Sequence, residues 1–361
     1  PLNGNGKIDA ARLPDPDGIL VSAADPMPPE TELQSSLLRI WRDVLGNSHI
    51  GIDDDFFQSG GDSLNAITIL AMLDGRATFA DLYRNPTVRT LSEAMEARRA
   101  ADTQGDSASE ESLLIRLSRQ AKPAPLHLVC FPYGGGNGTL FKDLADAVTQ
   151  TSDHCDVYAV NLPGRDIGRP EALQSGSEVA RRLAREIADR IQGELVLYGH
   201  CVGSALALET ARCLREEGVR VRTVFVGGVL PPRSGKRLGK NHDPWRWVPD
   251  GALVRFLEWI GLSGLCIRKE YLGGMVRAFR HDVRHHYRFF REQEARGMDQ
   301  LDIPVQCIVG ERDPLTRRYH RQHRRWARYG RLTGVTVISG ARHYFVKTHA
   351  RTLALVLTHL G

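Results

Sequence analysis

Short apolar runs alternate with helix-forming segments over the last two thirds of the chain, and this alternation limits the fold more than any other feature. Each run has five to eight residues, nearly all apolar: 126–131, 156–160, 194–199, 221–228, 304–310 and 335–339. Strands that are apolar on both faces are typical of parallel sheets covered by helices. The sequence therefore predicts an α/β fold with a mostly parallel sheet. Residues 231–300 break the alternation, which predicts a helical lid insertion or, alternatively, a disordered loop.

The third apolar run continues into Gly-His-Cys-Val-Gly at 199–203 and then directly into a helix-forming segment. A sharp turn from strand to helix is a nucleophile elbow, which presents its central side chain to a substrate. That central residue is Cys201. The remaining cysteines fit buried free thiols of a protein in a reducing cytosol, and we expect a cytoplasmic location; they are Cys130, Cys155, Cys213, Cys266 and Cys307.

A nucleophilic thiol needs a histidine as its base, and the base needs a carboxylate that orients it. In α/β-hydrolases the chain order is nucleophile, acid, histidine, with each residue following a strand. Asp313 follows the run 304–310, and His343 follows the last run. The sequence predicts a Cys201–His343–Asp313 triad, with Glu311 as the rival acid in the same loop.

Two backbone N–H groups are also needed to stabilise an oxyanion. One is expected from Val202, the residue after the nucleophile. The other is expected from the segment FPYGGGNG after the first apolar run, where glycines allow close approach of the backbone. Gly134 is the preferred residue there, and Tyr133 is the alternative.

The front of the chain has a different pattern. Residues 1–26 are rich in Pro, Asp and Gly and predict a tail, 27–100 predict a small all-helical domain, and 101–114 predict a flexible linker before a domain at 115–361. Ser63 lies between two glycines and a predicted helix. It serves either as a helix cap or as a phosphate attachment point, because backbone N–H groups at a helix start favour an anion.

Charge divides the chain. Residues 1–114 carry 9 Lys and Arg against 19 Asp and Glu, whereas residues 115–361 carry 39 against 24. Electrostatic docking of the two parts explains this division. The segment 317–331 has seven arginines and predicts either a solvated basic helix or a dock for the acidic part. No aromatic-basic motif points to nucleic acid, and no run of eighteen apolar residues points to a membrane span.

Three histidines, His281, His285 and His286, recur at helical spacing within the predicted insertion. A metal site would need a third well-placed ligand in this region. The sequence supplies none there, so no metal is expected.

The segment GGDSL, with DDFF before it and NPTVRTLSE after it, resembles the peptidyl carrier domain of nonribosomal peptide synthetases. The resemblance implies a 4′-phosphopantetheine arm on Ser63, added by a phosphopantetheinyl transferase. PLNGNGKID similarly resembles the closing motif of an adenylation domain, with Lys7 as its adenylate-contacting lysine. It implies upstream condensation and adenylation domains as partners.

Residues 126–361 resemble the thioesterase domains that end nonribosomal peptide and polyketide assembly lines, through FPYGGG, GHCVG and GARHYF. The first and third motifs are similar to the type II, proofreading branch, whereas fusion behind a carrier domain implies release of a peptidyl thioester in cis. The departure from the family is Cys201, because most members have serine.

Transfer from the carrier arm to a cysteine forms a second thioester and so keeps the acyl group activated. This favours intramolecular cyclisation to a strained lactone or lactam. Hydrolytic release, type II-like proofreading and experimental replacement of a serine remain alternatives. A non-catalytic docking module is the alternative of another class, which the intact order of Cys, Asp and His opposes.

Overall fold

The computed structural model describes residues 26–61, 63–104, 112–118, 124–165, 172–232, 245–261, 269–297 and 300–359. The chain divides into two compact units. One comprises Pro1–Ala77 and Asp81–Ala108, and the other comprises Thr78–Ala80 and Ser109–Gly361. Lys7 and the predicted tail up to position 25 lie outside the described residues, as does Cys266.

Helices form the regular structure of the described part of the first unit: α1 (Glu32–Leu45), α2 (Ser63–Met72), α3 (Phe79–Arg84, whose first two residues are assigned to the second unit) and α4 (Val88–Gln104). α1 begins where the Thr31 hydroxyl accepts a hydrogen bond from Gln34 N at 3.1 Å, and it ends at Gly46, which has a φ of 64°. The buried Trp41 packs edge-on against Phe56, with ring centroids 5.1 Å apart. The all-helical prediction is confirmed.

α4 runs four residues past position 100, into the segment that was expected to be linker. Residues 88–104 contain no glycine or proline, so the helix continues as far as Gln104.

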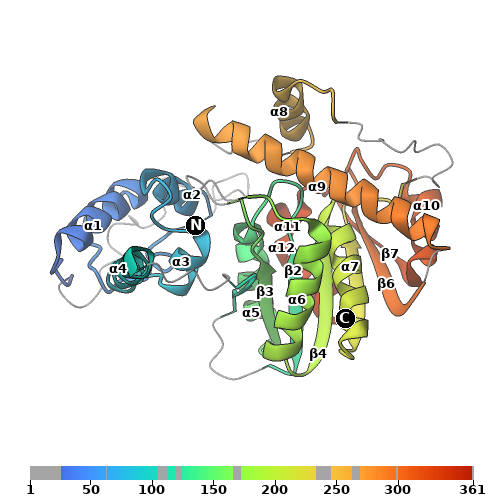
Figure 1. The fold of residues 1–361 in the computed structure, drawn as a ribbon, viewed down its shortest axis with the longest axis horizontal. Coiled ribbons are helices and arrows are strands. Elements are labelled where there is room, and N and C mark those ends of the chain that lie inside the picture. Colours follow the sequence, from blue (N-terminus) through green and yellow to red (C-terminus); the bar gives the residue numbers. More distant parts are fainter. Residues whose placement is uncertain are drawn as a thin grey trace, which may run out of the picture. The chain divides into compact units, whose positions relative to one another are not determined.

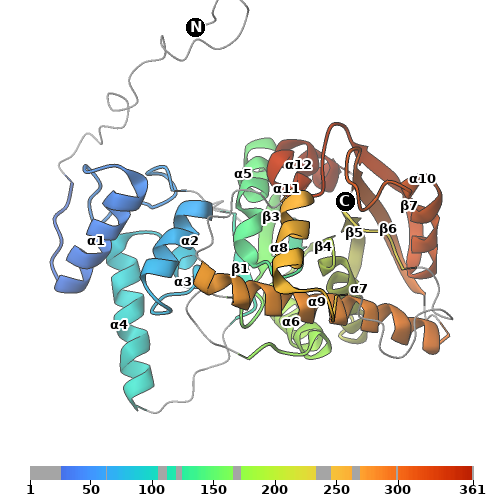
Figure 2. The same ribbon diagram turned by 90° about the horizontal axis from the view of Figure 1, so that it is seen from above.

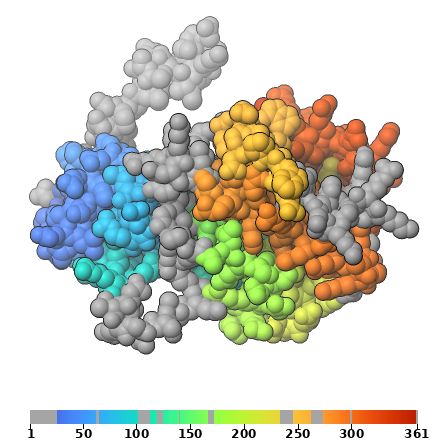
Figure 3. Space-filling model, turned by 45° about the horizontal axis from the view of Figure 1, so that its top comes forward, coloured from blue at the N-terminus to red at the C-terminus, as the bar shows by residue number. Residues whose placement is uncertain are grey.

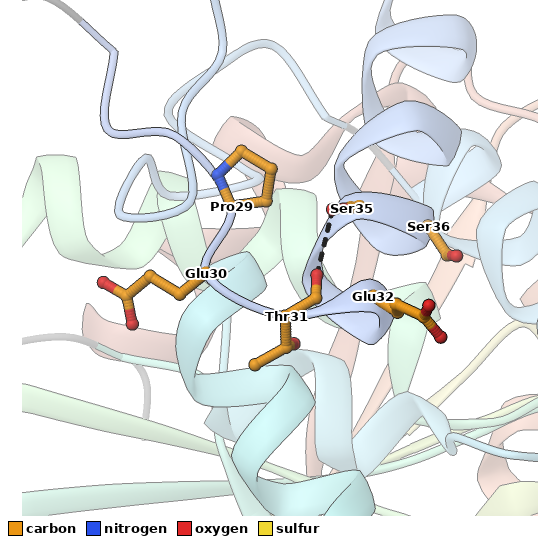
Figure 4. Close-up of a pocket in the computed structure, with 6 residues that line it drawn as sticks. All are labelled: Pro29, Glu30, Thr31, Glu32, Ser35 and Ser36. Atoms are coloured by element: carbon orange, nitrogen blue, oxygen red, sulfur yellow. Dashed lines mark hydrogen bonds between the residues drawn. The ribbon is translucent and has the colours of Figure 1, made fainter.

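An open hollow lies at the start of α1 (Figure 4). Its lining residues are Pro29, Glu30, Thr31, Glu32, Ser35 and Ser36. The Ser35 hydroxyl donates to the backbone oxygen of Thr31 at 2.9 Å, a local bond within the first helical turn. The hollow contains none of the predicted site residues.

A seven-stranded sheet forms the centre of the second unit, in the order β1-β3-β2-β4-β5-β6-β7 (Figure 1). Its strands are β1 (Leu114–Arg116), β2 (Leu126–Phe131), β3 (Cys155–Val160), β4 (Glu194–His200), β5 (Val221–Gly227), β6 (Leu301–Gly310) and β7 (Gly330–Ile338). All neighbouring pairs are parallel except β1 with β3. The predicted α/β fold with a mostly parallel sheet is confirmed.

The edge strand β1 was not predicted. It has three residues, too few to show a two-residue period, and it lies partly in the expected linker. Leu114 is fully buried and pairs with Val160, so tertiary packing rather than local pattern makes this segment a strand.

Helices cover both faces of the sheet. α6 (Gly176–Arg190) and α7 (Gly203–Glu216) pack together on one face, and α5 (Lys142–Thr151) packs with α12 (Ala350–His359) on the other (Figure 1). Because the strands from β2 to β7 are parallel, their carboxyl ends meet at one edge of the sheet, where side chains from several loops converge.

The insertion between β5 and β6 contains α8 (Asp250–Trp259) and the 27-residue α9 (Lys269–Ala295). Figures 1 and 2 show both helices at one end of the sheet, and Figure 3 shows them at the surface with α6. The described part of 231–300 is therefore a helical insertion and not a disordered loop.

The arginine-rich segment forms a short helix, α10 (Tyr319–Gln322), followed by the 3-10 turn η5 (His323–Arg328). Trp326 within it is fully buried. Among the described residues, no helix is both long and apolar enough to cross a bilayer.

Candidate functional site

Cys201 occupies the predicted turn between β4 and α7, with a φ of 53°. Few residues other than glycine adopt this left-handed conformation, and those that do are common at functional sites. The amide of Cys201 donates to Gly227 O at 2.7 Å, which fixes the turn to the end of β5. The side chain is half-buried and stands before the first turn of α7.

Two glycines flank the turn because no side chain fits at either position. A Cβ at Gly199 would lie 2.4 Å from Ser204 Cα, and a Cβ at Gly203 would lie 2.3 Å from Pro132 O. The spacing Gly-x-Cys-x-Gly therefore follows from the close crossing of the elbow, α7 and the end of β2.

His343 and Asp313 meet at the same edge of the sheet. Asp313 follows β6, His343 follows β7, and both side chains are fully buried. The Nδ1–H of His343 donates to Asp313 Oδ2 at 3.0 Å. Asp313 Oδ1 accepts a bond from Leu315 N at 2.9 Å, which holds the carboxylate in place.

Glu311, the rival acid, points elsewhere. Its carboxylate accepts bonds from Gly340 N at 2.7 Å and from the Ser339 hydroxyl at 3.1 Å, and it is exposed. The bond from Gly340 is the main cause of a lowered Glu311 pKa. The structure thus brings Asp313, and not Glu311, to His343.

The electrostatics of His343 link it to Cys201. Burial alone would lower the pKa of His343, but the negative charge of the Cys201 sulfur and the interactions with Asp313 raise it to about 10. Within the described residues, Nε2 of His343 has no hydrogen bond of normal geometry, so this atom is available to exchange a proton. A raised pKa suits His343 to take and hold the proton of the Cys201 thiol.

His200 is a neighbour that sequence reasoning missed. Its Nε2–H donates to His343 O at 3.0 Å, and its Nδ1 accepts from the Tyr198 hydroxyl at 2.7 Å. Burial, and then the charge of His343, holds the His200 pKa well below its usual value, so the ring is neutral. Its position next to the nucleophile in sequence was the available signal.

The glycine-rich loop after β2 lies against the elbow. A Cβ on Gly134 would sit 3.2 Å from Val202 Cγ2, which places the two predicted oxyanion residues side by side. Within the described residues, the amides of Gly134, Tyr133 and Val202 donate no hydrogen bond to the protein. The buried Tyr133 also lies close to Cys201, whose charge adds to the burial that raises the tyrosine pKa.

Ser63 is the first residue of α2. The turn before it includes Gly60, with a φ of 96°, and Gly61, whose amide bonds to Phe56 O at 2.9 Å. A serine in the first turn of a helix lies beside backbone N–H groups that no helical carbonyl satisfies. This backbone fits attachment of a phosphate group.

The histidines of α9 have protein partners. Nδ1 of His285 accepts a hydrogen bond from the Arg288 guanidinium at 3.3 Å, and His286 lies against the backbone of Val202. Burial lowers the pKa of His285 to about 3 and that of His286 to about 4. Among the described residues, no three His, Cys, Asp or Glu side chains are grouped to hold a metal.

Family models match two segments of the chain. The model of the thioesterase domain matches residues 126–358, and that of the phosphopantetheine attachment site matches residues 35–95. The second match shows that the chain takes a covalent phosphopantetheine group on a serine.

Curated relatives are much longer than this chain. It is 29% identical over 231 residues to a mycosubtilin synthase protein of Bacillus subtilis, covering 63% of this chain and 8% of that protein. It is 30% identical over 232 residues to bacitracin synthase 3 of Bacillus licheniformis, covering 63% of this chain and 3% of that protein.

Solved structures match the second unit. RedJ, a thioesterase from the prodiginine biosynthetic pathway in Streptomyces coelicolor, is 26% identical with a TM-score of 0.53, covering 67% of this chain and 94% of RedJ. BorB, a type II thioesterase from the borrelidin biosynthetic cluster, is 25% identical with a TM-score of 0.54, covering 70% of this chain and 99% of BorB.

Proposed function

Since the chain belongs to the thioesterase domain family and carries a phosphopantetheine attachment domain before it, we propose that it releases acyl chains from a nonribosomal peptide synthetase. An acyl group held at Ser63 passes to Cys201 and leaves by intramolecular cyclisation. The observation that carries the proposal is the half-buried thiol at a left-handed elbow, electrostatically coupled to a buried His343 that is hydrogen-bonded to Asp313.

Ser63 is the attachment residue in this proposal, because its backbone lies in the first turn of α2 after a glycine turn. Phosphopantetheine supplies a thiol that holds the acyl group as a thioester. The arm, together with the linker that the sequence predicts at 101–114, gives the acyl group the reach to pass to the thiol of the second unit.

In the first step, Cys201 Sγ attacks the carbonyl carbon of the acyl thioester. A carbon–sulfur bond forms, and the carbonyl electron pair moves to oxygen. The amides of Val202 and Gly134, with Tyr133 as the alternative, donate hydrogen bonds to this oxyanion. When the intermediate collapses, the bond to the departing sulfur breaks and His343 Nε2 gives that sulfur its proton.

In the second step, neutral His343 takes a proton from the attacking group while Asp313 holds the ring through Nδ1. An internal hydroxyl or amine gives a lactone or lactam, and Cys201 leaves as a thiolate. Because the acyl group on Cys201 is still a thioester, a weak nucleophile or a strained ring closure meets a more reactive carbonyl than an oxygen ester would present.

Mass spectrometry of the phosphopantetheinylated protein tests this proposal. Ser63 is loaded with an acyl chain that bears an internal hydroxyl or amine, and both adduct and product are followed. We expect a transient adduct on Cys201 and a product one water lighter than the free acid. Cys201→Ala should abolish both signals.

Cys213→Ala is the matched control, because Cys213 is also half-buried and burial raises its pKa to about 11. This variant should leave the adduct and the product unchanged. Release of the free acid alone would refute cyclisation and leave hydrolysis.

A second candidate function is proofreading hydrolysis of misloaded carriers in trans. It is favoured by the likeness to BorB, which is described as a type II thioesterase. A separately added carrier with a foreign acyl group distinguishes the two candidates, because proofreading predicts its hydrolysis and release in cis does not.

A non-catalytic docking module is the alternative of another class. It predicts no preferential alkylation of Cys201 over the other thiols. The proposal of catalysis predicts selective labelling of Cys201.

The proposed partners are upstream condensation and adenylation domains, a phosphopantetheinyl transferase and a peptidyl thioester. Residues 1–26, including Lys7, are proposed as the end of such an adenylation domain on their sequence alone. A cytoplasmic location is part of the proposal, and the free cysteines of the described residues support it.

A further inference from the structure

Asp282, in the middle of α9, binds the glycine-rich loop of the proposed active site. Its Oδ2 accepts a hydrogen bond from Gly135 N at 2.8 Å, although the two residues are 147 positions apart. Gly135 has a φ of 73° and directly follows Gly134, the proposed oxyanion donor. The carboxylate therefore anchors the peptide unit adjoining that donor.

Arg165 keeps this anchor charged. The other oxygen of Asp282, Oδ1, receives a bond from the guanidinium of Arg165, whose side chain is 3% exposed. Burial alone would raise the pKa of Asp282, but Arg165, His281 and the Gly135 amide hold it below its usual value. A hydrogen bond from an amide to an ionised acceptor is about twice as strong as one between neutral groups.

The same face of α9 also packs closely against the two glycines of the loop. A Cβ on Gly134 would lie 2.9 Å from Phe279 Cδ2, and one on Gly135 would lie 3.0 Å from Met275 O. Met275, Phe279, Asp282 and His286 are spaced by four, three and four residues, which places them in one stripe along a helix. The loop is thus seated directly on the helix.

The same stripe of α9 also reaches Val202, the residue that carries the second proposed oxyanion donor. His286, one turn after Asp282, is buried and lies against the backbone of Val202. One helix of the insertion therefore contacts the backbone on both sides of the proposed oxyanion hole.

We propose that α9 holds the oxyanion hole in its working geometry, with Asp282 as the positioning residue that fixes the glycine-rich loop through Gly135. This inference rests on the proposed function. In this proposal the packing of α9 against the glycine-rich loop sets the rate of acyl transfer, because it fixes the positions of the Gly134 and Val202 amides. A shift of the helix would free the Gly135 amide and misplace Gly134 without touching the thiol or its histidine.

The test compares two reactions of Cys201 in the full chain. Acyl transfer from Ser63 to Cys201 develops an oxyanion, whereas alkylation by iodoacetamide displaces iodide and needs no oxyanion hole. Asp282→Ala and Asp282→Asn are measured in single turnovers, with thermal unfolding followed for each variant. Glu292→Gln, on the same helix but paired only loosely with Arg288 at 3.9 Å, is the matched control.

We expect Asp282→Ala to slow acyl transfer by about 10²–10³-fold, the loss typical of removing one oxyanion donor. Asp282→Asn keeps an acceptor oxygen but loses the charge facing Arg165, so we expect about a 10-fold loss, which remains measurable even if the alanine variant unfolds. Alkylation rates should stay within about threefold of wild type, and Glu292→Gln should leave both reactions unchanged.

Unchanged acyl transfer in folded Asp282 variants would overturn the inference while leaving the proposed function intact. A parallel fall of transfer and alkylation would also overturn it, because that result indicates general damage to the site. Absence of any acyl adduct on wild-type Cys201 would overturn the proposed function, and this inference with it.

Discussion

Replacing Asp313 by asparagine isolates the charge that supports His343. The two side chains are fully buried and joined by a single hydrogen bond of 3.0 Å. Two unit charges at this separation interact by about 5–6 kcal/mol at an effective dielectric constant of about 20. A hydrogen bond to a charged group contributes about 1.5–3 kcal/mol net. At 1.36 kcal/mol per tenfold change in rate, these figures bracket the loss, and we expect kcat/KM to fall by about 10²–10³-fold for Asp313→Asn.

The assay follows release of acyl product from the loaded full chain, with thermal unfolding measured in parallel. Glu311→Gln is the matched control, because Glu311 lies in the same loop but binds Gly340 N and Ser339. We expect less than a threefold change for it. A larger loss in Glu311→Gln than in Asp313→Asn would refute the assignment of the acid.

Four further predictions concern His343, the elbow and the arginine-rich segment. In Cys201→Ala the pKa of His343 should fall from about 10, because the sulfur charge that opposes burial is gone; imidazole NMR resonances measure this. Since that pKa is raised above 6.5, protonated His343 stabilises the wild type below pH 6.5, and this contribution is lost as pH rises toward 10; urea unfolding across this range should show a smaller loss in Cys201→Ala. Gly203→Ala should abolish activity and destabilise the fold, because its Cβ would lie 2.3 Å from a backbone oxygen; circular dichroism and product release check both. Arg317→Glu with Arg321→Glu, both exposed, should slow transfer from Ser63 about 3- to 10-fold at low salt and less at high salt; equal rates at low salt would exclude docking there.

The parallel sheet was predictable because each strand carries its own signal. The runs at β2 and β4, for example, are mostly apolar and begin at the predicted residues. The order of Cys201, Asp313 and His343 was also readable, since each follows such a run. Their roles stay predictions, although the structure brings Asp313 to His343.

The rest depends on contacts between distant segments. β1 exists because Leu114 packs beside β3, and three residues carry no period of their own. The bonds of His200 to His343 and of Asp282 to Gly135 join residues 143 and 147 positions apart. Local pattern does not encode such pairings, because they arise only when the packed elements bring the two side chains together.

The seating of the glycine-rich loop on α9 has a consequence for engineering. Exchanging the insertion between relatives is an obvious way to change which acyl chains a release domain accepts. In this chain such an exchange would also replace Phe279 and Asp282, which pack against Gly134 and bind Gly135. A hybrid that keeps residues 275–286 and varies only α8 and the helical turns on either side of them would preserve the support of the loop. An exchange designed to change the acyl chain that is accepted should therefore leave residues 275–286 in place.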